Sequence, residues 1–359
     1  MENNNDSTAT PAHGWKRFVG PVVRYVLPLA LTVLLLVYMF KKVNFVEMWD
    51  LIKHGVDYWW ILAAMGISIF SHVFRAARWR LQLDALGIRP PFMALCCSIF
   101  GCYALNLVFP RLGEVWRCTY VASSQKASFS SVLGSMIGDR LADTLMVLLL
   151  LLLCLVVAAP ALEAFLVRYP VGRDIMGLLY NPWFWVCAVV LCIGAWVVLR
   201  IFRESVIVRK MKEMALKMWE GFSVVARMKG RWQFLFLTLC IWGCYYFQLY
   251  VAFYAFPFTR ALCHGEGMAW GLTPCLVAFV LSSISMAIPS NGGLGPWNLA
   301  IMFGLSIYGV TDAEGTAFSM LQWSGQTVML IILGIYTMVY ISMSKKSAKG
   351  ESKGGGFTL

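Results

Sequence analysis

The chain has 359 residues, of which 60% are hydrophobic and 13% are charged, and its mean hydropathy is +0.70. A water-soluble fold cannot bury so large an apolar fraction, so the composition predicts an all-α integral membrane protein that crosses the bilayer several times. The net charge of +12 is compatible with nucleic-acid binding, but the basic residues flank apolar blocks, where Lys and Arg set topology and meet anionic lipids. We therefore expect no nucleic-acid partner.

The N-terminal segment 1–21 is polar and then basic, and an apolar run follows it. That run is too long for a signal-peptide core and has no small-residue cleavage site, so we expect it to remain as the first membrane span. Eight apolar blocks occur in chain order: Val22–Phe40, Tyr58–Phe74, Pro91–Phe109, Val132–Ala159, Trp183–Ile201, Trp232–Phe256, Met268–Ile288 with a continuation to about Tyr308, and Ala317–Met343. The segment 344–359 is rich in Lys, Gly and Ser and is expected to form a flexible basic tail.

Charge bias predicts the topology, because short cytoplasmic loops carry an excess of Lys and Arg. The N-terminus, the loops 75–89 and 202–231, and the tail 345–353 are all basic, so all four should face the cytoplasm. Eight simple crossings fit this requirement poorly. We therefore expect six full spans and two re-entrant hairpins.

The first hairpin would enter the membrane at Pro91–Phe109 and turn at Pro110–Gly113, and the second would occupy 268–308 and turn at Pro289–Gly295. Residues 22–343 would then form one transmembrane domain with halves of about 22–159 and 183–343. The second half would begin on the opposite side from the first, as an inverted repeat. Inverted repeats with broken helices near the midplane are typical of transporters, although Gly and Pro are common in membrane helices and a kink need not be a site.

Charged residues follow the first predicted turn and open the fourth block. Arg111, Glu114 and Arg117 come directly after an apolar block, and in a helix Glu114 and Arg117 are one turn apart and able to pair. Asp139, Arg140 and Asp143 share one arc of a helical wheel, ahead of an apolar stretch. Charges at membrane depth usually pair and face a cavity. We expect the arginines either to bind a phosphate-bearing headgroup or only to lock the two elements together.

The second predicted turn is rich in Pro and Gly, and it would free backbone N–H groups near an anionic ligand. The candidate substrate-binding residues at the two turns are Asn106, Arg111, Glu114, Arg117, Asp139, Arg140, Asp143, Ser290, Asn291, Gly292, Gly293 and Gly295. No Cys or His spacing is typical of a metal site, so neither a metal nor a cofactor is expected. No catalytic motif is found.

These motifs resemble the lysylphosphatidylglycerol synthase transmembrane-region family, also called the flippase-like domain family. The resemblance runs from about residue 75 to 300 and rests on Arg78–Trp79, Asn106, Pro110–Glu114, Arg117, Asp139–Arg140, Asp143, Pro289, Gly292–Gly293 and Gly295. It implies a lipid-translocating module, here as a stand-alone member without the aminoacyl-transferase domain. Two departures are Asp139, where the family commonly has Glu, and Asn298, where an acid commonly follows the Gly-rich turn.

The leading hypothesis is a flippase that moves a phospholipid or another phosphate-bearing lipid between the leaflets of a bacterial inner membrane, with both termini in the cytoplasm. The expected partners are membrane lipids with anionic or aminoacylated headgroups, and a lipid-modifying enzyme is a possible protein partner. One alternative is a glycosyltransferase-type enzyme of polyprenyl-linked glycan assembly, although the predicted external loops hold no acidic pair for a metal and a sugar donor. Another is a non-catalytic subunit of a lipid-modifying complex.

Overall fold

The computed structural model describes residues 45–160, 230–265 and 268–354, with isolated positions between 30 and 37 and between 163 and 194. Every element among these residues is helical, so the predicted all-α class is confirmed. The predicted N-terminal segment 1–21 lies outside the described residues, and so do most of the predicted spans Val22–Phe40 and Trp183–Ile201.

Four of the described helices are long and apolar enough to cross a membrane. They are α3 (Tyr58–Ala85), α6 (Phe129–Val157), α11 (Arg231–Ala252, continued by the short 3-10 helix η1 at Phe253–Ala255) and α15 (Asp312–Gly354). The 22 residues of α11 already extend about 33 Å, enough for a hydrocarbon core of about 30 Å. Because α15 continues to Gly354, it enters the segment 344–359 that the sequence assigns to the tail.

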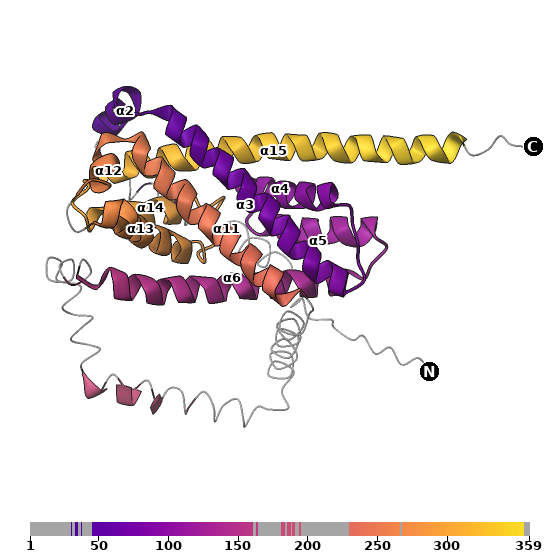
Figure 1. The fold of residues 1–359 in the computed structure, drawn as a ribbon, viewed down its shortest axis with the longest axis horizontal. Coiled ribbons are helices and arrows are strands. Elements are labelled where there is room, and N and C mark those ends of the chain that lie inside the picture. Colours follow the sequence, from indigo (N-terminus) through magenta and orange to yellow (C-terminus); the bar gives the residue numbers. More distant parts are fainter. Residues whose placement is uncertain are drawn as a thin grey trace, which may run out of the picture.

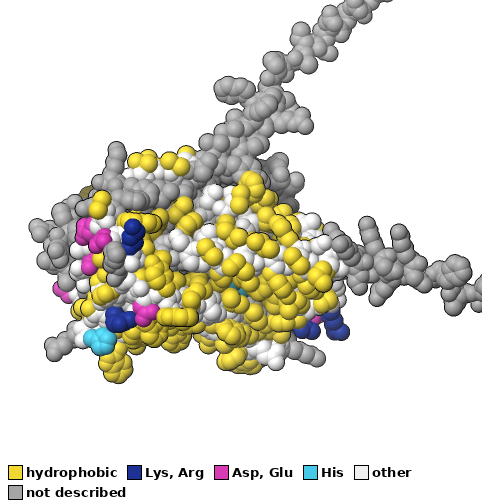
Figure 2. Space-filling view, turned by 90° about the horizontal axis from the view of Figure 1, so that it is seen from above, with side chains coloured by type: hydrophobic (Ala, Val, Ile, Leu, Met, Phe, Trp, Pro, Cys, Tyr) yellow, Lys and Arg dark blue, Asp and Glu magenta, His cyan; other side chains and the backbone are white. Residues whose placement is uncertain are grey.

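The outer surface of these helices suits lipid. On α6, Leu152 is 63% exposed and Val156 is 78% exposed. Hydrophobic side chains cover the middle of the face drawn in Figure 2, and charged side chains lie toward its ends. In water such a surface would aggregate, whereas in a bilayer it meets acyl chains.

The helices α3 and α11 cross the middle of the molecule side by side in opposite directions (Figure 1). At one end, the N–H of Asp57 donates to the carbonyl oxygen of Ala255 at 2.9 Å, and at the other end Gly230 lies beside Leu81. The short helix α2 (Phe45–His54) precedes α3 and packs on α15. The α3–α11 pair is thus the axis around which the other helices pack.

A helix–break–helix hairpin follows α3. Its arms are α4 (Phe92–Val108) and α5 (Leu112–Ser124), and we call residues 109–111 between them the first break. The 17 and 13 residues of the arms extend about 26 and 20 Å, less than the hydrocarbon thickness. Ile88 before α4 and Val121 near the end of α5 belong to the same buried cluster, so both open ends of the hairpin lie together.

A second hairpin is built in the same way. After the short helices α12 (Pro257–Leu262) and η2 (Ala269–Gly271), its arms are α13 (Leu272–Ser285) and α14 (Pro296–Ser306). We call residues 286–295 between the arms the second break. The arms pack so closely that a Cβ on Gly304 would lie 2.7 Å from the Cα of Ala278.

Each hairpin packs against the last span of the other predicted half of the chain. The helix α4 lies on α15, where Thr337 Oγ1 donates to the carbonyl oxygen of Cys97 at 3.2 Å. The helix α13 lies on α6, where Val277 and Val280 pack with Cys154. Figure 1 shows α15 and α6 on opposite sides of the central pair, with the two hairpins toward opposite ends. The two breaks are thereby brought together near the centre.

Candidate functional site

A cluster of seven charged side chains joins α3, α5 and α6, and we call it the charged cluster. Its members are Arg75, Arg78, Glu114, Arg117, Asp139, Arg140 and Asp143. Arg75 Nη1 lies 2.7 Å from Asp143 Oδ2, and Arg78 Nε donates to Asp139 Oδ1 at 2.8 Å. Arg78 also donates from Nη2 to Asp143 Oδ1 at 2.8 Å. Two arginines one turn apart on α3 thus bind two aspartates one turn apart on α6.

The central pair of helices extends this network. Arg78 Nη1 donates to Thr238 Oγ1 at 3.1 Å, and Arg75 Nη2 donates to the Tyr245 hydroxyl at 3.2 Å. Both acceptors lie on α11, on the face that packs against α3. The guanidinium groups therefore tie α3 to α6 and α11 at once. All three nitrogens of Arg78 have partners, whereas Arg75 uses Nη1 and Nη2 and leaves its buried Nε without one.

The prediction that residues 75–89 form a cytoplasmic loop is wrong for the first eleven of them. The helix α3 runs on to Ala85, and Arg75 and Arg78 are 2% and 0% exposed. A prediction from charge bias assumes that basic residues are solvated. Arg75 and Arg78 are instead buried, because the aspartates of α6 neutralise them there. The three-residue spacing of the arginines and the four-residue spacing of Asp139 and Asp143 are the signal that could have revealed the match.

The partly exposed edge of the charged cluster is an ion pair between hairpin and span. Arg140 Nη2 lies 2.7 Å from Glu114 Oε1, with 35% and 22% of the two side chains exposed. Arg140 also lies 3.9 Å from Asp143. Glu114 is therefore paired across the α5–α6 interface, and the expected pairing within α5 with Arg117 gives way to it.

Arg117 is as fully buried as Arg78, but its contacts are different. Its guanidinium is 4.6 Å above the ring of Trp79, and its Nη2 is 3.7 Å from Asp139 Oδ2, beyond hydrogen-bonding distance. Its side chain is fully buried, and none of its three nitrogens has a hydrogen-bond partner. A buried cation with five unused N–H donors is unusual, because such donors are costly to leave unpaired.

The members of the charged cluster on α3 and α6 lie well inside those two helices. Asp139 is ten residues from the start of α6 at Phe129, which corresponds to about 15 Å of helix. Arg75 is equally far from the end of α3 at Ala85. Five charged side chains are buried among the described residues, and all five belong to this cluster: Arg75, Arg78, Arg117, Asp139 and Asp143.

The two breaks touch each other. The N–H of Gly292 donates to the carbonyl oxygen of Asn106 at 3.1 Å, and the Asn291 amide donates to the carbonyl oxygen of Val108 at 3.1 Å. In the opposite direction, Arg111 Nη2 donates to the carbonyl oxygen of Ala287 at 3.3 Å. The two turns that hold the candidate substrate-binding residues therefore lie side by side. Arg111 itself is exposed and binds this main-chain oxygen, where the sequence predicted an acidic partner.

Backbone geometry at the breaks explains several of the predicted residues. Arg111 adopts φ 63° immediately before α5, and the side chain of Asn106 accepts the N–H of Gly113 at 2.9 Å. In the second break, φ is 58°, 84° and 90° at Gly292, Gly293 and Gly295, which glycine tolerates at little cost. Ser290 Oγ donates only to the nearby carbonyl oxygen of Ile288.

Two side chains outside the predicted site also hold the second break. Trp323 on α15 donates from Nε1 to the carbonyl oxygen of Gly292 at 2.9 Å. Asn298 is fully buried, and its side-chain oxygen accepts the N–H of Gly295 at 3.1 Å, which caps the start of α14. Where the resemblance leads one to expect an acid, this chain therefore has a neutral helix cap.

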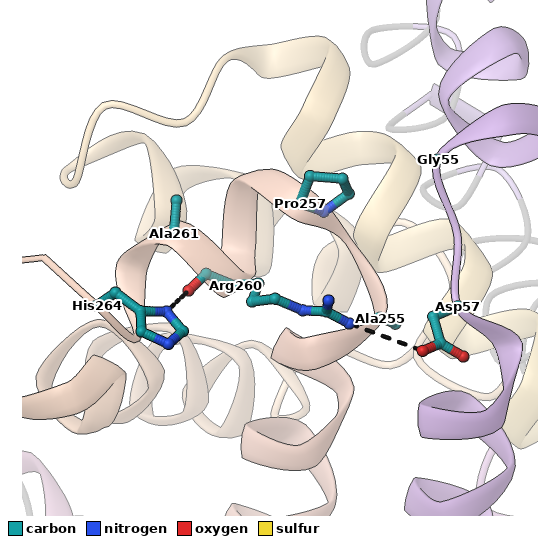
Figure 3. Close-up of a pocket in the computed structure, with 7 residues that line it drawn as sticks. All are labelled: Gly55, Asp57, Ala255, Pro257, Arg260, Ala261 and His264. Atoms are coloured by element: carbon teal, nitrogen blue, oxygen red, sulfur yellow. Dashed lines mark hydrogen bonds and ion pairs between the residues drawn. The ribbon is translucent and has the colours of Figure 1, made fainter.

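A pocket of about 390 Å³ lies elsewhere, between the start of α3 and α12 (Figure 3). Asp57 and Arg260 face each other across it, 3.7 Å apart, and His264 Nδ1 is 3.0 Å from the carbonyl oxygen of Arg260. Asp57 is 18 residues from Arg75, or about 27 Å along α3. None of the predicted site residues lines this pocket, and the described residues hold no group of three or more candidate metal ligands.

Comparison with known families bears on the chain as a whole. The family model for the lysylphosphatidylglycerol synthase transmembrane region matches residues 25–334. The chain belongs to this family. The resemblance inferred from the motifs is thereby confirmed, and the match covers both hairpins, the charged cluster and both breaks. No curated protein and no solved structure matches the chain. Membership in the lysylphosphatidylglycerol synthase transmembrane-region family and the long apolar helices together make this an integral membrane protein linked to membrane lipids.

Proposed function

We propose that the chain is a lipid flippase, which moves a phosphate-bearing lipid between leaflets while the acyl chains remain in the bilayer. The observation that carries this proposal is the position of the charged cluster. Its members Arg75 and Asp139 are buried about 15 Å from the nearer ends of α3 and α6, and its α5 members follow a helix break that contacts the second break. Charges so deep are expensive, and they are typical of substrate and ion pathways. No catalytic step is assigned to the chain.

The proposed topology has six full spans and two re-entrant hairpins in an inverted repeat. The packing supports it, because α3, α4, α5 and α6 correspond in order to α11, α13, α14 and α15. The contact of α4 with α15 has its counterpart in that of α13 with α6, and the contact of α5 with α6 has its counterpart in that of α14 with α15. The antiparallel α3–α11 pair would lie on the axis that relates the halves, the arrangement found in transporters with midplane sites.

In this arrangement the headgroup is held where the breaks meet. The breaks present freed backbone groups, and the charged cluster supplies guanidinium groups suited to bidentate phosphate contact. We place the protein in a bacterial inner membrane with both termini in the cytoplasm, as the basic segments suggest.

Reconstitution into proteoliposomes tests the proposal. Acyl-labelled lipids would be incorporated, and an impermeant reductant would quench only the label of the outer leaflet. A flippase lets the quenched fraction rise from about half toward completion, whereas empty vesicles remain at half. If a folded preparation moves none of the phospholipids above empty vesicles, the proposal is wrong.

Two substitutions separate transport from folding. Arg111→Ala removes an exposed side chain that donates a hydrogen bond to the carbonyl oxygen of Ala287, so we expect loss of transport with a normal folded yield. Asp143→Ala removes a partner of Arg75 and Arg78, so it should lower both transport and folded yield. If Arg111→Ala transports at the parent rate, the first break has no part in headgroup binding.

A further inference from the structure

Resting on the proposed flippase function, we infer that the transported headgroup carries one net negative charge, as a single phosphodiester does, and that Arg117 is the residue that binds it. Aminoacylated headgroups with a net positive charge are thereby excluded as cargo. The inference comes from the charge balance of the buried cluster and from the unused donors of Arg117.

The buried part of the charged cluster has an uncompensated positive charge. Three buried arginines, Arg75, Arg78 and Arg117, face two buried aspartates, Asp139 and Asp143, so three positive charges minus two negative charges leaves one. The edge pair of Arg140 and Glu114 adds one charge of each sign and does not change this balance. Among the described residues no other charged side chain is buried.

The excess charge can be assigned to Arg117. Arg75 and Arg78 both make hydrogen bonds to Asp139 and Asp143, so these four side chains form a compact neutral group. Arg117 is outside that group, because its nearest acidic oxygen is 3.7 Å away and its Nε, Nη1 and Nη2 have no hydrogen-bond partner. The planar guanidinium offers a fork of N–H groups that matches the two free oxygens of a phosphodiester.

Desolvation decides which cargo this arrangement favours. Away from water an unpaired charge is costly, and a pair that sums to zero is far less so. A monoanionic headgroup would neutralise Arg117 and leave the complete site neutral. A zwitterionic headgroup would leave the excess positive charge in place, a cationic headgroup would add to it, and a dianionic headgroup would reverse it.

The edge pair marks the route to Arg117. Arg140 and Glu114 are the partly exposed members of the cluster, whereas Arg117, one turn after Glu114 on α5, is fully buried. A headgroup that arrives between α5 and α6 would first meet Arg140, and it would then replace the weak attraction between Arg117 and Asp139.

The experiment compares transport rates in the same proteoliposomes for acyl-labelled lipids of different charge. Phosphatidylglycerol, phosphatidylserine and phosphatidylinositol each carry one net negative charge on headgroups of different shape. Phosphatidylethanolamine is neutral, lysylphosphatidylglycerol is positive and cardiolipin carries two negative charges. We expect the three monoanionic lipids to move at similar rates, each at least about tenfold faster than the others, a ratio that corresponds to a modest difference in binding free energy.

Substitutions then shift the charge balance in known directions. Arg117→Gln removes the excess charge, so the preference for phosphatidylglycerol over phosphatidylethanolamine should fall at least about tenfold. Glu114→Gln, at the partly exposed edge, raises the excess positive charge of the cluster to two, so it should favour cardiolipin. This variant tests the inference even if Arg117→Gln does not fold. Arg80→Gln changes the chain charge as Arg117→Gln does, but Arg80 is 49% exposed near the end of α3, so the preference should stay unchanged.

Each result has a distinct meaning. If all lipids move at similar rates, or if lysylphosphatidylglycerol or phosphatidylethanolamine moves fastest, the flippase proposal stands and the charge inference is overturned. If no lipid moves, both are overturned. An unchanged preference in a folded Arg117→Gln protein would remove Arg117 from the headgroup site.

Discussion

The backbone N–H of Gly292 donates a hydrogen bond to the carbonyl oxygen of Asn106 at 3.1 Å, and this bond connects the second break to the last turn of α4, next to the first break and 186 residues earlier in the chain. Gly292 has φ 58°, and a Cβ added to it would lie 2.6 Å from Cδ2 of Leu107. Both the backbone conformation and the close approach thus favour glycine, and the contact between the breaks depends on this position.

Substitution of Gly292 should therefore uncouple the breaks. Gly292→Ala combines an unfavourable φ, worth about 1 kcal/mol or more, with a steric contact that moves Leu107. We expect a lower melting temperature and transport reduced several-fold. Gly309→Ala is the matched control, because Gly309 has φ 85° but open space around its Cβ position. Equal transport in the two variants would mean that the contact between the breaks has no functional role.

The buried ion network predicts a large difference between two arginines two residues apart. Arg78→Gln leaves Asp139 and Asp143 short of one buried counter-ion, and breaking such a pair costs about 3–5 kcal/mol. Arg80→Gln removes only an exposed contact with Asp84 at 3.8 Å, worth about 0.5 kcal/mol or less. Thermal unfolding in detergent should show a strongly lowered midpoint for the first variant and a nearly unchanged midpoint for the second. Similar midpoints would indicate that the cluster contributes little to stability.

The hairpin geometry makes a prediction about topology. Arg89 before α4 and Ser128 after α5 are exposed and lie at the open ends of the first hairpin. If α4 and α5 re-enter, an impermeant thiol reagent should label Arg89→Cys and Ser128→Cys from the same side of the membrane. Lys53→Cys on α2, at the other end of α3, should be labelled from the opposite side, and the parent chain gives the background of native cysteines. Labelling of Arg89→Cys and Ser128→Cys from opposite sides would mean that the hairpin spans the membrane.

The sequence predicts the helical membrane class and the positions of the breaks because both depend on features that are local in the chain. The length of an apolar block indicates a span such as α6, and Pro and Gly indicate where α5 and α14 begin. The partners of Arg75 are harder to predict, because its environment is set by α6 and α11, which lie 64 and 170 residues further along the chain. A basic residue at a block end is typical of a solvated loop until such long-range partners are known.

Asn298 is a similar case. The resemblance to the family leads one to expect an acidic residue at this position. The buried amide oxygen of Asn298 instead accepts the N–H of Gly295 and caps the start of α14. Propensity and motif position do not reveal this cap, since it depends on φ 90° at Gly295. Asn298 lacks the charge of the acid that is common in the family, and its role in this structure is to hold the end of the second break.

The edge pair of the charged cluster offers a test of interaction rather than of single residues. Arg140 Nη2 and Glu114 Oε1 are 2.7 Å apart across the α5–α6 interface, so Glu114→Arg and Arg140→Glu should each place like charges in contact. The double variant restores opposite charges with their positions exchanged. We expect each single variant to lower the free energy of unfolding and the transport rate, and the double variant to recover part of both, with a coupling energy of about 0.5–3 kcal/mol. Recovery should be incomplete, because Asp143 lies 3.9 Å from Arg140 and would repel a glutamate there. If the double variant loses as much stability and transport as the two single variants combined, the pair contributes nothing to the joining of the first hairpin to α6.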